Sequence, residues 1–321
     1  MLKVCSFLPA VTQTIYDMGL QEHLVGITFE CPEQALKEKP TVVQCVLEGL
    51  DLSSRQINSF FSASKRDGES LYYVNEDLLE ELKPDVIFTQ DVCEVCQIDT
   101  ECTMAAVAKL PKQPEIISIT PQSLEDVFKS AEVIATAMGV PEKGHKYTRL
   151  LRNRISETEH RFQKSGSKRQ KVFFMEWMDP IFNSGHWIPD QVRIAGGKDK
   201  LSNPCGDSTG MHWEELVKYD PDILVIAPCG FSIERTLSEI SLLTSKTGWE
   251  TMSAVRNNKV YIADFELFTQ SSLSTLADGI ALLNYLFHSE HSVLPSKLKN
   301  SYIRWSADHK ATRPFKDANL N

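Results

Sequence analysis

Short apolar runs alternate along the chain with longer segments whose apolar residues recur at helical spacing. The short runs are bounded by turn-forming residues, which is typical of buried strands. In the segment 121–138, apolar residues recur about every 3.6 positions, and Gly139 and Pro141 end the pattern. The predicted strands are 4–8, 24–28, 86–89, 116–120, 172–175, 223–226 and 259–263. Strands that alternate with helices predict parallel sheets with crossover connections, so the predicted fold class is α/β.

One phrase occurs twice in this pattern. Residues 80–88 read Glu-Glu-Leu, a Pro-Asp pair and an apolar run, and they lead to Cys93. Residues 214–226 repeat that order and lead to Cys229. Each copy predicts a helix end, a turn, a buried strand and a cysteine-bearing loop. Duplicated α/β units are typical of two similar lobes, and ligands of such sheets bind beyond the carboxyl ends of the strands.

Several helices are predicted with their caps. Residues 52–66 have helical periodicity, and Ser53 or Ser54 is available as the N-cap. Asn75 is the predicted cap of a helix over 76–82.

A long helix over 142–163 is apolar on one face only, as suits a helix that bridges two lobes. It leads to a division of the chain into four parts. These are an α/β lobe at 1–120, a helical region with the interlobe backbone helix at 121–168, a second α/β lobe at 169–290 and a polar, irregular tail at 291–321.

Composition and charge narrow the function. The 321 residues are 42% hydrophobic and 24% charged, so the chain can bury the core of a globular protein. The net charge is −9, and no basic stripe with interleaved aromatic residues occurs, which argues against a nucleic-acid partner. No apolar run is long enough to span a membrane.

The compartment is predicted from the start of the chain and from its cysteines. Residues 1–8 read as a first strand rather than as a signal peptide. The protein is therefore expected in the cytoplasm if the sequence is complete, and in the periplasm or outside the cell if a signal peptide was removed. Eight cysteines are too sparse for a disulfide scaffold, so reduced thiols are expected.

The loops that follow the predicted strands supply candidate ligand contacts. From the first lobe these are Pro9, Glu30 and Asp91, and from the second they are Glu176, Trp177, Phe182, His186, Trp187, Phe231 and Phe265. Trp177, Phe182 and Trp187 lie within eleven residues, and their faces offer stacking area to a planar, extended ligand. The alternative is that these rings fill the core.

Cysteine and histidine residues raise a second kind of site. Cys93 and Cys96 have the spacing of a metal chelate or a thiol redox pair, and structural thiols are the alternative. Because one pair cannot complete a metal site, further ligands must come from Cys31, Cys102 and His186, brought close only by the fold, and Cys31 and His186 are the predicted ones.

Motifs of several enzyme classes are missing. The chain has no Gly-x-Ser-x-Gly elbow, no phosphate-binding Gly-x-x-x-x-Gly-Lys loop and no Gly-x-Gly-x-x-Gly after a strand. A two-lobed α/β chain without such a motif is predicted to bind a ligand and to have no catalytic residue. A cytosolic thiol-dependent, corrinoid-processing enzyme that uses Cys93 or Cys96 as its nucleophile is the alternative.

A set of segments carries a family resemblance. In order along the chain they are 6–12 (SFLPAVT), 24–28 (LVGIT), 82–87 (LKPDVI), 179–185 (DPIFNSG), 195–197 (AGG) and 260–261 (VY). The ordered set resembles the cobalamin-binding members of the helical-backbone, or class III, substrate-binding proteins. These serve ABC importers of corrinoids, haem and siderophores. The similarity covers roughly residues 3–288, and the segments around Glu30, Cys93 and Trp187 resemble a signal-less subgroup.

The resemblance implies two Rossmann-like lobes joined by one rigid helix, with a corrinoid held between them. It places Phe182 on an aromatic wall and Asp264 on the opposite rim. An insertion around 52–76 implies a lid that carries Glu69 and Tyr72. An ABC-type permease is the implied partner, although members of the family are exported and this sequence starts with a predicted strand.

We therefore predict a non-enzymatic, two-lobed protein that binds cobalamin or a related corrinoid. His186 is a candidate ligand to the corrinoid metal because imidazole binds cobalt and other transition metals well. The alternative function is transition-metal binding through Cys31, Cys93, Cys96 and His186.

Overall fold

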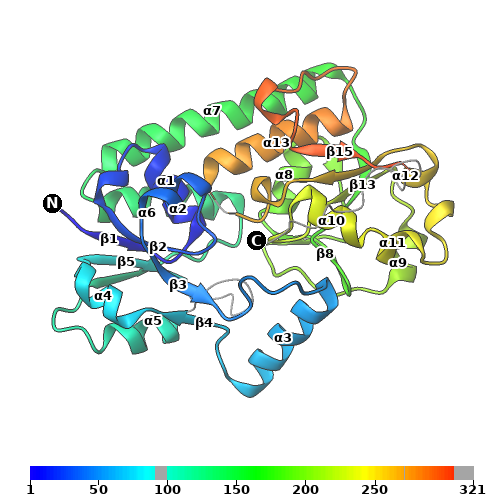
Figure 1. Cartoon of the computed structure of the whole chain (residues 1–321). Helices are drawn as coiled ribbons and strands as arrows, with labels where there is room; N and C mark the ends of the chain where they lie inside the picture. The colour runs from blue at the N-terminus through cyan, green and yellow to red at the C-terminus, as the bar shows by residue number, and fades with distance from the viewer. Residues whose placement is uncertain (91–99, 271, 307–321) are drawn as a thin grey trace.

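Two sheets form the centres of two lobes, and helices cover them (Figure 1). The structure, a computed structural model, describes residues 1–90, 100–270 and 272–306. The strand order is β4-β3-β2-β1-β5-β6 in the first sheet and β11-β7-β13-β14-β15 in the second. The predicted fold class, α/β with two Rossmann-like lobes, is confirmed.

Each sheet is parallel except at one edge. The first sheet contains β1 (Val4–Ser6), β2 (Leu24–Thr28), β3 (Thr41–Cys45), β4 (Tyr72–Val74), β5 (Val86–Thr89) and β6 (Glu115–Ser118). The second contains β7 (Gln170–Met175), β11 (Gly197–Lys198), β13 (Ile223–Ile226), β14 (Val260–Ala263) and β15 (Tyr302–Arg304). The antiparallel strands are β4, which pairs with β3, and β15, which pairs with β14.

Strand β15 corrects the prediction of an irregular tail after residue 290. Ile303 pairs with Ile262 of β14, and the indole of Trp305 is buried in the core of the second lobe. The prediction missed this strand because it is only three residues long and shows no apolar run of its own. The predicted boundaries of the four parts are not tested by this pairing and stay a prediction.

The repeated phrase forms the same structure in both lobes. Helix α4 (Glu76–Leu82) ends at Lys83 and helix α9 (Trp213–Tyr219) ends at Asp220, and both of these residues have left-handed backbone. The amide of Asp85 then donates to the carbonyl of Lys3, and the amide of Asp222 donates to that of Lys171, both at 2.8 Å. These bonds start β5 beside β1 and β13 beside β7.

Helix α7 (Pro141–Ser165) runs along both lobes and confirms the predicted backbone helix (Figure 1). Its 25 residues give a length of about 37 Å. Gly144 lets α7 approach α6 (Leu124–Ala137) closely, because a Cβ at that position would lie 2.6 Å from the Cβ of Ala135. Tyr147, Leu151 and Ile155 of α7 join one core with both α6 and α13 (Leu273–Phe287). The lobes are thus fixed to each other along α7.

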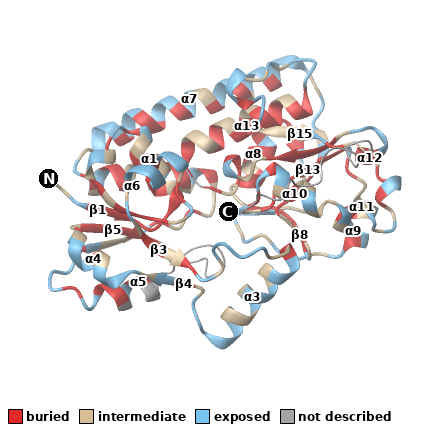
Figure 2. Cartoon of the chain, in the orientation of Figure 1, coloured by how far each residue is buried: buried red, intermediate tan, exposed pale blue. Residues whose placement is uncertain are grey.

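The remaining helices lie in the connections between the strands. They are α1 (Pro9–Asp17), α2 (Glu33–Glu38), α3 (Ser54–Asp67), α5 (Thr100–Val107), α8 (Ile188–Ile194), α10 (Ile233–Glu239), α11 (Ser241–Thr244) and α12 (Ser253–Arg256). The predicted caps of two helices are confirmed: Ser53 forms a capping box with Gln56, and Asn75 accepts from the amide of Leu78. Buried residues concentrate in the sheets, whereas α3 is mostly exposed or half-buried (Figure 2).

Candidate functional site

The predicted ligand contacts lie just beyond the carboxyl ends of parallel strands in both lobes. Pro9 follows β1, and Glu30 follows β2. In the second lobe, Glu176 and Trp177 follow β7 and Phe265 follows β14. Because parallel strands end at one edge of their sheet, each group shares an edge, which is the usual ligand position in this class of fold.

Three aromatic residues of the second lobe come together. Trp177 in β8 (Trp177–Met178) pairs across strands with Phe182 in β9 (Ile181–Phe182). The ring of Trp177 also lies 5.0 Å from that of Phe231, between centroids. Trp177 and Phe182 are half-buried, and Phe231 is buried. The indole Nε1 of Trp177 is buried and has no hydrogen-bond partner among the described residues, which leaves a donor for a ligand or a water molecule.

Trp187 has a different place from the other predicted aromatic contacts. Its Nε1 donates to the carbonyl of Phe268 at 2.6 Å, and its ring packs against the cores of both lobes. Trp187 therefore helps to join the lobes, and its predicted ligand contact stays a prediction.

The His186 side chain is held by its backbone and by a carboxylate. His186 has left-handed backbone with φ of 53°, in β10 (Gly185–His186), which pairs with β12 (Asn203–Pro204). Its Nε2 lies 3.2 Å from an oxygen of Asp207. Burial lowers the pKa of His186, and Asp207 acts in the opposite direction. When Asp207 accepts from Nε2–H, the Nδ1 of the neutral ring keeps a lone pair for a metal.

Carboxyl groups at these edges have raised pKa values. Glu30 is partly open to solvent, yet desolvation of its carboxyl by the surrounding protein raises the pKa to about 7. The charge of Glu48 acts in the same direction. Burial also raises the pKa of Asp264, which accepts from the amide of Glu266. Glu176 is buried, and its backbone bonds to Phe182 and Cys229 hold the aromatic strands in place.

Two further predicted contacts are buried in the first lobe. Pro9 is the first residue of α1. Tyr72 lies between Phe29 and Phe61, with ring centroids 6.3 and 6.4 Å away. Both positions are covered by protein, so their predicted ligand contacts also stay predictions.

The predicted metal ligands are only partly described. Cys31 is buried, and burial raises the pKa of its thiol to about 12; its sulfur lies 3.1 Å from the hydroxyl of Thr12. Asp91, Cys93 and Cys96 lie outside the described residues. Within 1–90, 100–270 and 272–306, no three His, Cys, Asp or Glu residues gather as metal ligands. The four-residue metal site stays a prediction.

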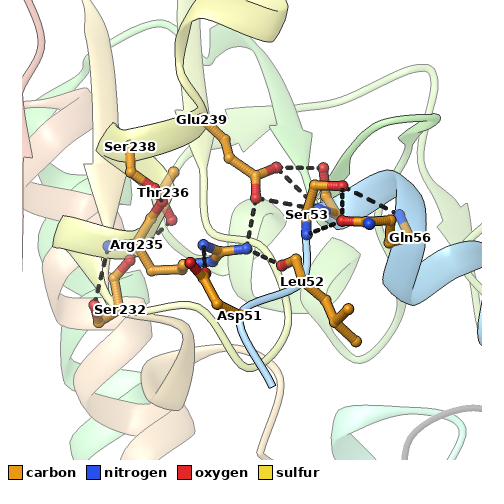
Figure 3. Close-up of polar contacts among 10 residues, drawn as sticks. Asp51, Leu52, Ser53, Gln56, Ser232, Arg235, Thr236, Ser238 and Glu239 are labelled. Carbon is orange, nitrogen blue, oxygen red and sulfur yellow. Dashed lines mark hydrogen bonds and ion pairs between the residues drawn. The ribbon is translucent and has the colours of Figure 1, made fainter. Parts of the chain in front are cut away.

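The sequence did not indicate a polar cluster that joins the two lobes at the start of α3 (Figure 3). Glu239 and Arg235 of α10 contact residues 51–54, and Arg55 forms an ion pair with Asp179 at 2.8 Å. The spacing of Arg235 and Glu239, four residues apart on one helix, is the only signal of this cluster in the sequence.

Known proteins match the chain in sequence and in fold. A relative from Bacillus subtilis (strain 168), named an uncharacterized ABC transporter substrate-binding lipoprotein, is 24% identical over 291 residues, covering 87% of this chain and 77% of its own. A periplasmic haem-binding protein from Pseudomonas aeruginosa aligns with a TM-score of 0.69 and 17% identity over 92% of this chain and 96% of its own. The periplasmic vitamin B12-binding protein of Vibrio cholerae aligns with a TM-score of 0.63 and 16% identity, over 89% and 96%.

No helix in the described part of the chain is long and apolar enough to cross a membrane.

The family assignment rests on the sequence match. A sequence profile of the family described as periplasmic binding protein matches residues 9–267. The resemblance identified from the sequence is confirmed: the chain belongs to the periplasmic binding protein family, whose members bind ligands and do not catalyse reactions.

Proposed function

We propose that the protein binds a corrinoid between its two lobes and delivers it to an ABC-type permease. The observation that carries this proposal is the cluster of Trp177, Phe182 and Phe231 at the carboxyl edge of the second sheet. Two half-buried rings beside a buried one, with an indole N–H that has no partner among the described residues, suit a large flat ligand with polar groups around its rim.

Related proteins support this class of ligand. The similar structures include proteins whose names give vitamin B12 and haem as ligands, and both are planar macrocycles that hold a metal. The B. subtilis relative is named an ABC transporter substrate-binding lipoprotein. We extend that role to this chain, with a permease as its partner and ligand capture on the outer side of the membrane.

The acidic residues favour a corrinoid over haem. Carboxyl groups lie at the edges of both sheets, at Glu30 in the first lobe and Asp264 in the second. Haem carries anionic propionates, which these groups repel in their ionised form, whereas the side-chain amides of a corrin ring donate hydrogen bonds to carboxyl oxygens in either protonation state. The net charge of −9 acts in the same direction over a longer range.

The test is an isothermal titration calorimetry experiment in which the purified protein is titrated with cyanocobalamin and, separately, with haem. We expect cyanocobalamin to bind with a Kd of about 1 μM or lower. Replacing Trp177 with Ala should weaken binding at least about tenfold, and Trp177→Phe should keep most of the affinity. No cobalamin binding up to about millimolar, or tighter binding of haem, contradicts the proposal.

His186 supports a second point of contact, at the corrinoid metal itself. Asp207 orients the ring, and the lowered pKa of His186 keeps the imidazole neutral at pH 7. Hydroxocobalamin has an axial water that an imidazole replaces, whereas cyanide blocks that position in cyanocobalamin. We expect a visible spectral change with hydroxocobalamin that is lost in His186→Ala; an unchanged spectrum in the wild type excludes axial ligation.

A further inference from the structure

Helix α3 connects the two lobes on the side away from α7 (Figure 1). The chain leaves the first lobe after β3, and α3 begins beside α10 of the second lobe. It returns to the first lobe through β4, which pairs with β3. The lobes are therefore joined twice, by α7 on one side and by α3 on the other, with the candidate ligand site at the strand ends of both sheets.

The contact at the start of α3 is a cluster of charged and polar groups, shown in Figure 3. We call it the α3 clasp: Asp51, Leu52 and Ser54 from the first lobe, and Arg235 and Glu239 from the second. The carboxylate of Glu239 accepts from the amide of Ser54 at 3.0 and 3.1 Å and from its hydroxyl at 2.5 Å. Arg235 donates to the carbonyl of Leu52 and pairs with Asp51 at 3.5 Å.

Burial makes this clasp stronger than a surface ion pair. Ser54 is fully buried, and the side chain of Glu239 is only 11% exposed, so this holds for the Ser54–Glu239 bonds; the side chain of Asp51 is fully exposed, and its pair with Arg235 adds little. Charge-assisted hydrogen bonds gain strength where water is excluded. The neighbouring pair of Arg55 and Asp179 adds less, because the Arg55 side chain is 76% exposed.

The rest of α3 has little to hold it. Ser54 is the only buried residue of the helix, which spans Ser54–Asp67. Phe61 touches Tyr72 of the first lobe, and Phe60 is 43% exposed. A helix with few buried apolar contacts opens locally at a low free-energy cost, so the contacts at its ends determine its position. The bonds of the clasp are polar and can be exchanged for bonds to water, so it can open reversibly.

We propose that α3 is a lid over the ligand site, held shut from the second lobe by the Arg235–Glu239 side of the clasp. Opening the clasp is then the step that admits and releases the ligand. The part of this proposal that concerns ligand passage rests on the proposed corrinoid binding; the part that concerns the movement of α3 does not.

The first test needs no ligand and uses hydrogen exchange of the full chain. In Glu239→Gln and in Arg235→Ala, amides of α3 should exchange at least about tenfold faster than in the wild type, while those of α6 stay unchanged. Ser54→Ala removes the hydroxyl bond to Glu239 from the first lobe and keeps the amide bonds, so it should speed exchange in α3 less than Glu239→Gln does, and it guards against a folding defect in α10. Glu214→Gln, on the exposed surface of α9, is the charge-matched control. Unchanged exchange in α3 overturns the lid.

The second test follows cobalamin association and dissociation by stopped flow. A lid that gates access slows both rates, so Glu239→Gln should raise both about tenfold and change the Kd much less. A lost ligand contact instead raises the dissociation rate alone, and that result, or unchanged rates, overturns the gating role. If wild-type protein binds no cobalamin, the proposed function fails, and the exchange experiment still decides whether the clasp holds α3.

Discussion

Replacing Gly185 with Ala perturbs the candidate site through a single methyl group. Gly185 lies buried beneath the segment 206–208, next to His186. A Cβ on Gly185 would lie 2.4 Å from the amide nitrogen of Ser208, 2.5 Å from the carbonyl oxygen of Gly206 and 2.6 Å from the carbonyl carbon of Asp207. All three are backbone atoms, so no side-chain rotation relieves the clash, and one of the two strands must move.

The size of the effect follows from that geometry. Overpacking a well-packed site costs about 1–3 kcal/mol, and three backbone contacts below 3.0 Å put Gly185→Ala at the upper end, about 3 kcal/mol. Two glycines serve as controls. At Gly210 an added Cβ is 3.4 Å from the ring of Phe182, so we expect less than about 0.5 kcal/mol. At Gly19 there is open space but φ is +66°, so backbone strain alone costs about 1 kcal/mol.

The stability assay is urea unfolding of the three variants, monitored by tryptophan fluorescence. Cobalamin affinity is measured separately under native conditions. The shift of β10 against β12 should also displace His186 and lower the affinity of Gly185→Ala more than that of Gly210→Ala. If Gly185→Ala and Gly210→Ala unfold within about 0.5 kcal/mol of each other, the loop adapts freely and the argument for a fixed His186 is wrong.

Two further predictions concern charge and backbone. The pKa of Glu30 is raised from 4.5 to about 7, so the folded state binds the proton more tightly than the unfolded state. The free energy of unfolding should therefore fall as the pH rises through this window. Urea unfolding at a series of pH values should show a smaller change of this free energy with pH in Glu30→Gln than in the wild type. Solvent reaches this carboxyl, so the effect is reduced by screening. Lys83→Gly relieves left-handed strain and should stabilise by about 0.5–1 kcal/mol, whereas Asp220→Gly should destabilise because it also removes two hydrogen bonds to the start of α12. Equal shifts in thermal unfolding for the two glycine variants contradict this reasoning.

Features that depend on neighbouring residues in the sequence were predicted well. The caps Ser53 and Asn75 and the helix 142–163 each have a local signal, a hydroxyl or amide before a periodic run or a one-sided apolar stripe. Strands β1, β2, β5, β6, β7, β13 and β14 were predicted for the same reason, because buried runs are apolar along their whole length, whereas β3, β4 and β11 were not predicted.

Features that depend on distant residues were not predicted. Strand β15 gains its pairing from β14 and its anchor from the burial of Trp305, and neither is visible in a polar stretch of sequence. The clasp joins Ser54 to Glu239, which are 185 positions apart, through groups that look like ordinary surface residues. In the candidate site, the sequence indicated many aromatic residues close together. Only the structure shows that Trp177 pairs with Phe182 across β8 and β9 and that Trp187, bonded to Phe268, lies at the junction of the lobes.

The second copy of the repeated phrase leads into α10, which is the partner of α3 in the clasp. Each copy builds the same start of a central strand, with equivalent amide bonds from Asp85 and Asp222, so the two lobes present equivalent edges. After β13 the chain turns through Phe231, whose ring lies beside that of Trp177, into α10, which supplies the two charged residues of the clasp. A change in the position of α10 therefore alters ligand contact and lid closure together, so the proposed ligand and the proposed lid are coupled through one short helix.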